Sequence, residues 1–358
     1  MSERQNTRVL LAERPVNRAP VESDFRIERV PVPEPGEGEV MIRNLFLSLD
    51  PYMRGRMSAA KSYAEPVAIG GVMAGEAVGR VVASRHPGCQ PGDLVLAHTG
   101  WQEYAAVPGE GVTKVNPNLA PPSHYLGVLG MPGMTAYCAL LYLGEPQPGQ
   151  TVLVSAASGA VGQVVGQIAK IRGCRVVGVA GSDEKVDYVR NELGFDAAVN
   201  YKLPDGTPKD FETLSGELAA LCPDGINIYF DNVGGLVHDA ALANIAQFAR
   251  VIICGTISVY NELEKQDIGR RWMRLLLVKR ARMEGFLVFD FMARYPEAIG
   301  LMAPAQRDVG AVAASKFAFT AAESSAVPSL NLMFGRSLTV HSVRASLPSM
   351  LSARYGSI

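Results

Sequence analysis

The sequence predicts an α/β protein with a β-rich first part and a doubly wound parallel sheet in its second part. Up to about residue 125 the chain is rich in Pro and Gly, and short β-prone runs lie between these turn residues. From Leu126 onward, short apolar runs rich in Val and Ile alternate with helical segments. Strands of this composition, separated by helices, are typical of a parallel sheet that is buried on both faces. A chain of 358 residues is long enough for two such domains.

The predicted elements follow one another in chain order. In the first part, strands are expected within residues 39–49, 77–84 and 93–99. In the second part, the apolar runs are residues 151–155, 175–181, 226–235 and 250–258, and helices are expected at 160–173 and 183–194.

A glycine-containing loop, SAASGAVG (155–162), lies between the first apolar run and the first helix of the second part. This is the context that a dinucleotide-binding turn requires. Ala157, Gly159 and Gly162 occupy the three positions of the G-x-G-x-x-G pattern. Gly159 would let the backbone approach a pyrophosphate, Gly162 would let the helix pack closely, and N–H groups at the helix start would bind the anion. The alternative is a tight turn that binds nothing.

The end of the second apolar run indicates which dinucleotide the loop would bind. The residues there are Ala180, Gly181 and Ser182, so the acid that would hold a ribose 2′-hydroxyl is missing. Lys185 lies one turn further on and could pair with a 2′-phosphate. The neighbouring acids at 183–184 argue against this, but they fit the first turn of a helix capped by Ser182. The pattern favours NADP over NAD.

Composition excludes several other classes of function. A formal net charge of −1 argues against nucleic-acid binding, and no apolar stretch is long enough for a membrane span. The first fifteen residues are charged and lack the apolar core of a signal peptide. The five cysteines are scattered and form no Cys-x-x-Cys pair. We therefore expect a cytoplasmic protein with reduced thiols and no structural zinc.

Seven stretches, in family order, resemble the zinc-free branch of the medium-chain dehydrogenase/reductase superfamily. This branch contains leukotriene hydroxydehydrogenases, prostaglandin reductases, alkenal double-bond reductases and bacterial curcumin reductases. The stretches are LSLDPYMRGRM (47–57), GMPGMTAY (130–137), AASGAVG (156–162), VVGVAGSDEKV (176–186), NYK (200–202), YFDNVGG (229–235) and ICGTISVYN (253–261).

The resemblance implies a GroES-like β-barrel substrate domain at residues 1–126 and a Rossmann NADP-binding domain at 127–310, with the active site between them. Residues 311–358 would return to the first domain. The implied reaction is NADPH-dependent reduction of a carbon–carbon double bond conjugated to a carbonyl. The implied cofactor residues are Gly159, Ala160, Val161 and Gly162 at the pyrophosphate, Gly181, Ser182, Lys185 and Tyr201 at the 2′-phosphate, Asn232 nearby, and Met131, Thr135, Cys254 and Gly255 at the nicotinamide.

Two tyrosines are the candidate catalytic residues. Hydride addition to the β-carbon of an enone leaves negative charge on the carbonyl oxygen, so the site must place hydrogen-bond donors there. Tyr260 follows the apolar run at 250–258, at the carboxyl end of the predicted sheet, where such folds bind ligands. The resemblance places Tyr52, from the first domain, at the substrate as well. The proton for the α-carbon can come from water, so no general acid is assigned.

The chain departs from its relatives at two places. Zinc-dependent members carry Gly-His-Glu-x-x-Gly, whereas Gly75 stands here in the place of the ligand histidine, so no metal is expected. After about residue 303 the sequence becomes rich in Ser and Ala and loses the family pattern. A divergent tail and a shifted reading frame both account for this change.

Two alternative functions stay open at this point. The chain could instead be an NADPH quinone reductase, or a cofactor-binding protein without turnover.

A basic run at 269–283 bears on the oligomeric state of the protein. It is interpreted as one solvated helix face followed by a strand, MEGFLV (283–288). Because that strand lies near the subunit interface in relatives, the resemblance implies a homodimer. The expected partner is a small-molecule enone, enal or quinone, and neither nucleic acid nor a membrane.

Overall fold

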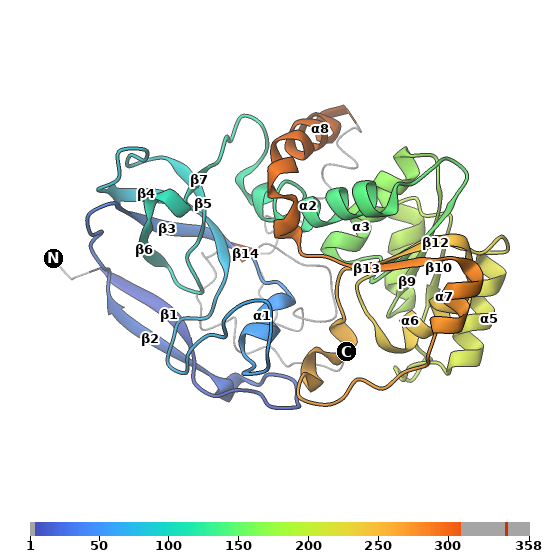
Figure 1. Cartoon of the computed structure of the whole chain (residues 1–358). Coiled ribbons are helices and arrows are strands. Elements are labelled where there is room, and N and C mark those ends of the chain that lie inside the picture. Colours follow the sequence, from blue (N-terminus) through green and yellow to red (C-terminus); the bar gives the residue numbers. More distant parts are fainter. Residues whose placement is uncertain (1–3, 309–340, 343–358) are drawn as a thin grey trace. The chain divides into compact units, whose positions relative to one another are not determined.

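The computed structural model describes residues 4–308 and 341–342 (Figure 1). These residues divide into two compact units. The first unit contains residues 4–127, the segment Tyr260–Lys265, and 341–342. The second unit contains Val128–Val259 and residues 266–308. Of the tail that was expected to return to the first domain, at 311–358, all but His341–Ser342 lies outside the described residues.

The first unit is built on an antiparallel sheet with strand order β14-β3-β4-β5-β7, and β6 also pairs with β3. Strands β1 and β2 form a separate antiparallel pair. Residues Glu39–Arg43 of β3 pair with β6, while Phe46 and Leu47 pair with β14. The bounds are β1 Gln5–Leu11, β2 Phe25–Pro31, β3 Glu39–Leu47, α1 Tyr52–Arg56, β4 Glu76–Ser84, β5 Leu94–His98, β6 Tyr104–Pro108, β7 Thr113–Lys114 and β14 His341–Ser342, with short 3-10 turns at Glu22–Asp24, Gly109–Gly111 and Pro122–Leu126.

The second unit is a parallel sheet of six strands in the order β10-β9-β8-β11-β12-β13. Figure 1 shows α2 and α3 on one face of this sheet and α5, α6 and α7 on the other. The predicted doubly wound parallel sheet is therefore confirmed. The strands are β8 Thr151–Ser155, β9 Arg175–Ala180, β10 Ala197–Asn200, β11 Ile226–Asp231, β12 Ile245–Ile253 and β13 Arg282–Gly285. The helices are α2 Met131–Cys138, α3 Ala160–Ile171, α4 Asp183–Asp187, α5 Phe211–Leu221, α6 Gly235–Leu242, α7 Met273–Lys279 and α8 Tyr295–Asp308.

This strand order fixes where the second unit can bind a ligand. The chain builds β8, β9 and β10 outward in one direction, then crosses back to place β11 on the other side of β8. The helices after β8 and β11 therefore cover opposite faces, and the carboxyl ends of these two strands are the place where folds of this kind bind ligands. Ser155 and Asp231 are the residues at those ends.

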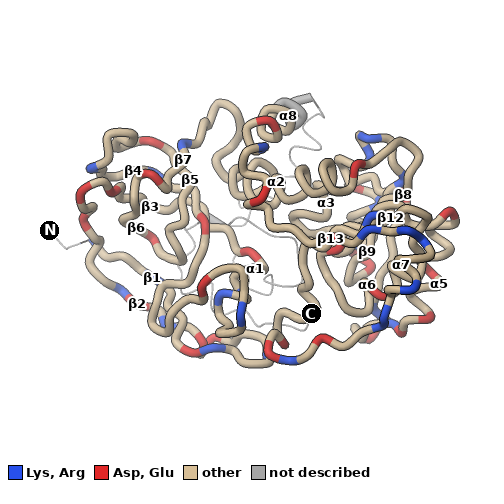
Figure 2. Tube along the Cα trace, in the orientation of Figure 1, with Lys and Arg blue, Asp and Glu red and all other residues tan. Residues whose placement is uncertain are grey.

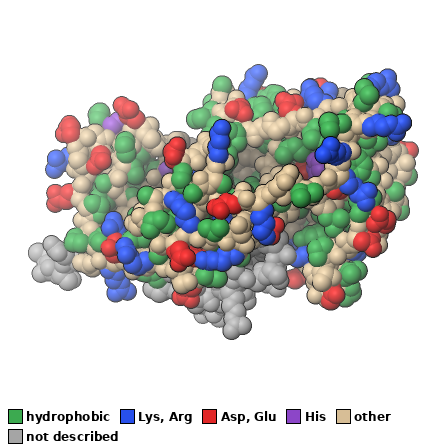
Figure 3. Space-filling model, turned by 60° about the horizontal axis from the view of Figure 1, so that its bottom comes forward, with side chains coloured by type: hydrophobic (Ala, Val, Ile, Leu, Met, Phe, Trp, Pro, Cys, Tyr) green, Lys and Arg blue, Asp and Glu red, His purple; other side chains and the backbone are tan. Residues whose placement is uncertain are grey.

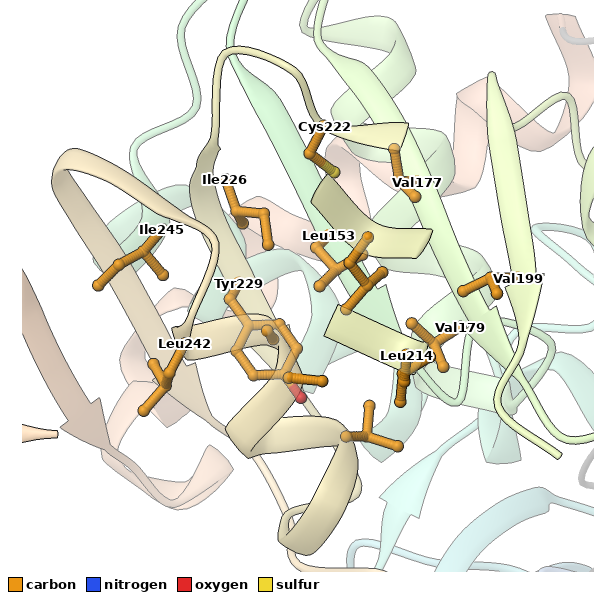
Figure 4. Packing of buried hydrophobic residues seen from close by; sticks show 14 of the residues in the cluster. Leu153, Val177, Val179, Val199, Leu214, Cys222, Ile226, Tyr229, Leu242 and Ile245 are labelled. Carbon is orange, nitrogen blue, oxygen red and sulfur yellow. The ribbon is translucent and has the colours of Figure 1, made fainter. Parts of the chain in front are cut away.

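The core of the second unit joins the strands to the helices on one face of the sheet. Figure 4 shows Leu153, Val177 and Tyr229 from the strands packed with Leu214 of α5 and Leu242 of α6. All five are buried, and every residue of β8 is buried. Each side chain of this size stabilises the fold by about 1.5–3 kcal/mol when removed from water. The Val- and Ile-rich runs in the sequence are thus the central strands.

Three elements differ from the sequence-based expectation. The helix expected at 183–194 is α4 followed by a π-helical segment, Tyr188–Glu192. Strand β12 begins at Ile245, ahead of the apolar run at 250–258, and includes Phe248, which has a left-handed φ of 60°. Within the basic run at 269–283, α7 ends where Arg280 adopts a left-handed φ of 49°. Local irregularities of this kind depend on tertiary packing, so a periodic pattern cannot reveal them.

The surface of the described residues carries both signs of charge. Figure 2 shows acidic and basic residues interspersed along both units, with Lys and Arg near α7. On the face in Figure 3, hydrophobic side chains are scattered among charged ones. Among the described residues, no helix is both long and apolar enough to span a bilayer. All five cysteines are free thiols.

Candidate active site

The turn after β8 presents backbone N–H groups at the carboxyl end of the sheet. Ala156 adopts a left-handed φ of 48°, and Gly159 is the N-cap of α3. The first hydrogen bond of the helix runs from Gln163 N to Gly159 O at 3.0 Å. The N–H groups of residues 160–162 therefore have no intrahelical acceptor and point out of the helix start, where the helix dipole also favours an anion.

The glycines of this turn are required by close backbone contacts. A Cβ atom at position 162 would lie 2.3 Å from the carbonyl oxygen of Ala156, so only glycine lets α3 approach the turn this closely. At Gly159 the nearest atom to an added Cβ would be the same oxygen, at 3.1 Å. Ala157, which takes the first glycine position of the pattern, is fully buried. A pyrophosphate-binding turn therefore fits the residues present.

The ends of β9 and β10 form a second part of the candidate site. The hydroxyl of Ser182 accepts a hydrogen bond from Lys185 N at 3.3 Å and so caps α4. A Cβ on Gly181 would lie 3.1 Å from the ring of Tyr201, so the absence of a side chain admits that ring. Asp183, the first acidic residue after Ser182 in the sequence, accepts a hydrogen bond from Asn200 Nδ2 at 2.9 Å. Four predicted residues, Gly181, Ser182, Lys185 and Tyr201, thus come from neighbouring segments of one sheet edge.

Asp231, at the end of β11, joins the strand ends of the candidate site. Its Oδ1 accepts hydrogen bonds from the Tyr229 hydroxyl at 2.7 Å, Ser155 Oγ at 3.0 Å, Val233 N at 2.9 Å and Gly234 N at 3.0 Å. Its Oδ2 lies 2.8 Å from Nδ1 of His238, on α6. The side chain is fully buried. One carboxylate therefore fixes β8, the loop after β11 and the start of α6.

The backbone of the same segment extends this connection to β12. The carbonyl of Asp231 accepts from Cys254 N at 2.8 Å and from Gly255 N at 3.1 Å. Asn232 donates from its backbone N to Ser155 Oγ and from Nδ2 to Ser155 O, both at 2.8 Å. The predicted cofactor residues Asn232, Cys254 and Gly255 are thus held together beside the end of β8.

The charge of Asp231 is stabilised by its donors. Burial alone would raise the pKa of this carboxyl, but hydrogen bonds from His238, from two backbone N–H groups and from Tyr229 hold it below its usual value. Ser155, Asp231 and His238 do not form a hydrolytic triad. The serine and the histidine both contact the aspartate, whereas a triad needs the histidine between the other two, and Ser155 is fully buried. The network therefore has a structural role at the carboxyl edge of the parallel sheet.

Two predicted nicotinamide residues lie on a different element. Met131 is the first residue of α2, and Thr135 follows one turn later. The Thr135 hydroxyl donates to Met131 O at 2.7 Å, and α2 packs against α3. The structure does not show them in contact with Asn232, Cys254 or Gly255. Burial raises the pKa of the Cys254 thiol to about 12, so this cysteine is protonated at neutral pH and is not a nucleophile.

In the first unit, Tyr52 begins α1, and its pKa responds to two carboxyl groups, the buried Asp50 and the half-buried Glu76. Burial raises the pKa of Asp50 to about 6, although a hydrogen bond from Ser48 opposes this, and burial together with the charge of Asp50 raises that of Glu76 to about 7. The pKa of the Tyr52 phenol lies well above its usual value because of burial and both carboxyl charges. Tyr52 is therefore a protonated hydrogen-bond donor at neutral pH.

The place of the zinc-ligand histidine is filled by other side chains. A Cβ on Gly75 would lie 2.9 Å from Trp101 Cδ1 and 3.1 Å from Leu47 Cδ1, so an imidazole does not fit there. Among residues 4–308 and 341–342, no group of three or more His, Cys, Asp or Glu side chains is arranged to hold a metal. The described residues therefore do not supply the donor set of a catalytic zinc site.

Tyr260 belongs to the first unit, as Tyr52 does, although its neighbour Val259 belongs to the second. It lies in a 3-10 helix, Ile257–Glu262, and is half-buried. The start of this helix is attached to the loop after β11: Ser258 N donates to Val233 O at 3.0 Å.

Sequence reasoning missed the network around Asp231. Asp231 and His238 lie seven positions apart, and Ser155 is 76 positions away. The stretch YFDNVGG (229–235), which contains Asp231, gave no indication of these hydrogen bonds. A charged residue at the end of an otherwise apolar strand was the one available signal.

Two family models match the chain. The model described as the N-terminal domain of oxidoreductase matches residues 7–115, and the one described as zinc-binding dehydrogenase matches residues 160–304. The NADPH-dependent curcumin reductase of Escherichia coli is 48% identical to the chain over 287 residues, which is 79% of this chain and 81% of the relative. The chain belongs to the zinc-free medium-chain dehydrogenase/reductase family.

Further relatives in this family support the same assignment. The NADP-dependent 2-alkenal reductase of Nicotiana tabacum is 46% identical over 310 residues, 85% of this chain and 88% of the relative. A solved structure of CurA from Vibrio vulnificus in complex with NADPH is 40% identical and superimposes with a TM-score of 0.79, covering 94% of this chain and 99% of the other. The two-part fold predicted for a zinc-free medium-chain dehydrogenase/reductase is thus confirmed.

Replacing the charge of Asp231 tests its structural role. We expect Asp231→Asn to lower the free energy of unfolding by about 3 kcal/mol, because the amide presents an N–H group to donors that need an acceptor. Urea denaturation followed by circular dichroism measures this loss. Because the pKa of Asp231 is lowered by folding, the advantage of the wild type is present above the usual carboxyl pKa and is lost at lower pH.

The matched control is Tyr229→Phe, which removes one donor and leaves the carboxylate in place. It should cost about 1 kcal/mol. Equal losses for the two variants would contradict a central role for the Asp231 charge.

Proposed function

We propose that the chain is an NADPH-dependent reductase of α,β-unsaturated aldehydes and ketones, which transfers hydride to the β-carbon. The observation that carries this proposal is its similarity, at 48% and 46% identity, to relatives named as a curcumin reductase and a 2-alkenal reductase. The carboxyl edge of the parallel sheet supports it, because the glycine turn after β8, the capped start of α4 and the absence of an acid at Gly181 suit a phosphorylated dinucleotide.

The cofactor is proposed to bind along the carboxyl edge of the parallel sheet. The N–H groups of Ala160, Val161 and Gly162 would contact the pyrophosphate, with Gly159 allowing its approach. Lys185 would pair with the 2′-phosphate beside Gly181, Ser182 and Tyr201. The nicotinamide side would be lined by Asn232, Cys254 and Gly255, and by Met131 and Thr135 of α2. When bound, NADPH supplies the hydride.

The two tyrosines are proposed to stabilise the enolate. Negative charge develops on the carbonyl oxygen of the substrate as the β-carbon is reduced, and a fixed hydroxyl donor lowers the energy of that state. Tyr260 is the principal proposed donor. Tyr52 is a suitable second donor because its raised pKa keeps its proton in place at neutral pH. The α-carbon is then protonated from water.

A panel assay tests the proposed function. NADPH oxidation should proceed with enals and enones and fall strongly when NADH replaces NADPH, while chelation of metals should leave the rate unchanged. Turnover of quinones alone would assign the chain to quinone reduction. Binding of NADPH with no oxidation by any of these compounds would overturn the proposed reductase activity.

Removing the Tyr260 hydroxyl tests its role in the reaction. Loss of one preorganised donor costs about 100- to 1000-fold in turnover, and we expect the low end for Tyr260→Phe because a second donor remains. The dissociation constant for NADPH should stay near that of the wild type. Combined with Tyr52→Phe, the loss should be less than additive if both hydroxyls serve one oxygen. Turnover of Tyr260→Phe within about twofold of the wild type would refute this role.

We further propose that the protein is a cytoplasmic homodimer. Strand β13 is an edge of the parallel sheet, and its outer backbone groups can pair with a second copy. Large apolar side chains are exposed on α7, where Met273 and Leu277 are 71% and 77% exposed, and on the 3-10 helix after β13, where Phe289 and Met292 are 51% and 60% exposed. An open strand and exposed apolar side chains in the segments before and after it suit a second copy of this chain. The free cysteines are consistent with a reducing compartment.

Light scattering should give about twice the chain mass of 38.3 kDa. Leu277→Glu should yield monomers, because the charge would be buried in the dimer but exposed in the monomer. Ile171→Glu, at a residue 72% exposed at the end of α3, is the matched control and should stay dimeric. A monomeric wild type would refute this assembly.

A further inference from the structure

The segment that carries Tyr260 leaves one compact unit and enters the other for six residues. Val259 belongs to the second unit, Tyr260–Lys265 belong to the first, and Gln266 belongs to the second again. Some contact must hold so short a segment in the first unit, since fixing each backbone residue costs about 1–2 kcal/mol of conformational entropy. Its position determines where the candidate catalytic hydroxyl of Tyr260 is presented.

Arg54 of α1 provides such a contact. Its Nε donates to Oδ1 of Asn261 at 3.1 Å, across 207 positions of sequence. Its Nη2 donates to the carbonyls of Pro15 and Arg18, at 2.7 Å and 3.1 Å. Arg54 is 3% exposed. A guanidinium is a rigid planar group, so the carbonyls that hold one end also fix the direction in which Nε points.

A second interaction of this segment is local and exposed. Lys265 Nζ pairs with Glu262 Oε1 three positions away, and about half of each side chain is exposed. An exposed pair within one turn contributes little and does not tie the segment to the rest of the unit. The part-buried Arg54–Asn261 hydrogen bond has a charged donor, so it is stronger, and it joins segments that are 207 positions apart in the sequence.

This hydrogen bond also connects the two candidate catalytic tyrosines. Tyr52 lies two residues before Arg54 in α1, and Tyr260 is the residue before Asn261. Consecutive Cα atoms are about 3.8 Å apart, so each tyrosine backbone can shift little while the hydrogen bond is intact. Both hydroxyls must reach one carbonyl oxygen to act together, and a loss of alignment of about 1 Å can lower a rate strongly.

We propose that Arg54 and Asn261 are positioning residues for the reduction, which set Tyr260 relative to Tyr52 through their hydrogen bond. This inference rests on the proposed enone reductase function. Neither residue donates to the substrate. Their hydrogen bond keeps the Tyr260 segment in the orientation in which its hydroxyl can meet the developing enolate.

The test changes the acceptor and leaves the buried arginine in place. Asn261→Ala should lower kcat for an enone by about tenfold, which corresponds to about 1.4 kcal/mol, with KM within about threefold and NADPH affinity within about twofold of the wild type. Asn261→Asp keeps an oxygen acceptor for Arg54 and should retain at least about half of the turnover. A merely structural asparagine would not give this split between kcat and KM together with rescue by aspartate.

Glu262→Ala is the matched control, because it removes a neighbouring exposed pair of the same segment. It should behave as the wild type. Amide hydrogen exchange of residues 260–265 should be about tenfold faster in Asn261→Ala than in Glu262→Ala. When combined with Tyr260→Phe, Asn261→Ala should add less than about a twofold further loss.

Two results would overturn the inference. The first is that Asn261→Ala matches Glu262→Ala in turnover and in hydrogen exchange. The second is that the double variant Asn261→Ala with Tyr260→Phe loses turnover by the product of the two single-variant losses. If the proposed function itself is wrong, the wild type reduces no enal or enone, and this result distinguishes that case from the two results above. Hydrogen exchange still reports in that case whether Asn261 holds the segment.

Discussion

The carboxyl edge of the parallel sheet, where the cofactor is proposed to bind, depends on the hydrogen bonds of the buried Asp231 carboxylate. An isolated ion removed from water costs several kcal/mol even after the protein relaxes around it. Here that cost is offset by the Tyr229 hydroxyl, Ser155, two backbone N–H groups and His238. The ends of β8 and β11, the following loop and the first turns of α6 are held in one arrangement because they share this acceptor.

Tyr229 links this polar edge to the apolar core. Its ring is fully buried among the side chains of β8, β11 and the covering helices, while its hydroxyl reaches the carboxylate. A shift of the sheet core would therefore displace the groups at the carboxyl edge of the sheet, and a shift of that edge would disturb the core. Packing rigidity and electrostatic preorganisation come from the same residues, which suits a site where backbone donors must be fixed before a ligand arrives.

In the first unit, close packing and burial determine the protonation of the side chains near Gly75. Trp101 and Leu47 occupy the space that a ligand histidine at position 75 would need, so this region is packed like a core. The two carboxyl groups that remain nearby, Asp50 and Glu76, have pKa values raised to about 6 and about 7 by burial. Their charges also discourage ionisation of Tyr52. The Tyr52 phenol is thus kept neutral.

The sequence by itself determined the class of fold and the position of the glycine turn that is proposed to bind the cofactor. Apolar runs such as 151–155 and 175–181 predicted central strands, since a strand buried on both faces must be apolar throughout. The sequence also showed the glycines at 159 and 162 and the missing acid after Ala180. These features could be recognised because a few neighbouring residues determine the backbone geometry and the charge of a turn.

Only the tertiary structure decided which distant residues meet. Asp231 with Ser155, Trp101 against Gly75, and Arg54 with Asn261 join positions that no periodicity relates. No local sequence pattern predicts the left-handed conformation of Phe248 in β12 or the π-helical turn after α4. The physical reason is that a buried polar group is satisfied by whichever partner the fold brings within hydrogen-bond distance, and that choice is made by the packing of the whole unit.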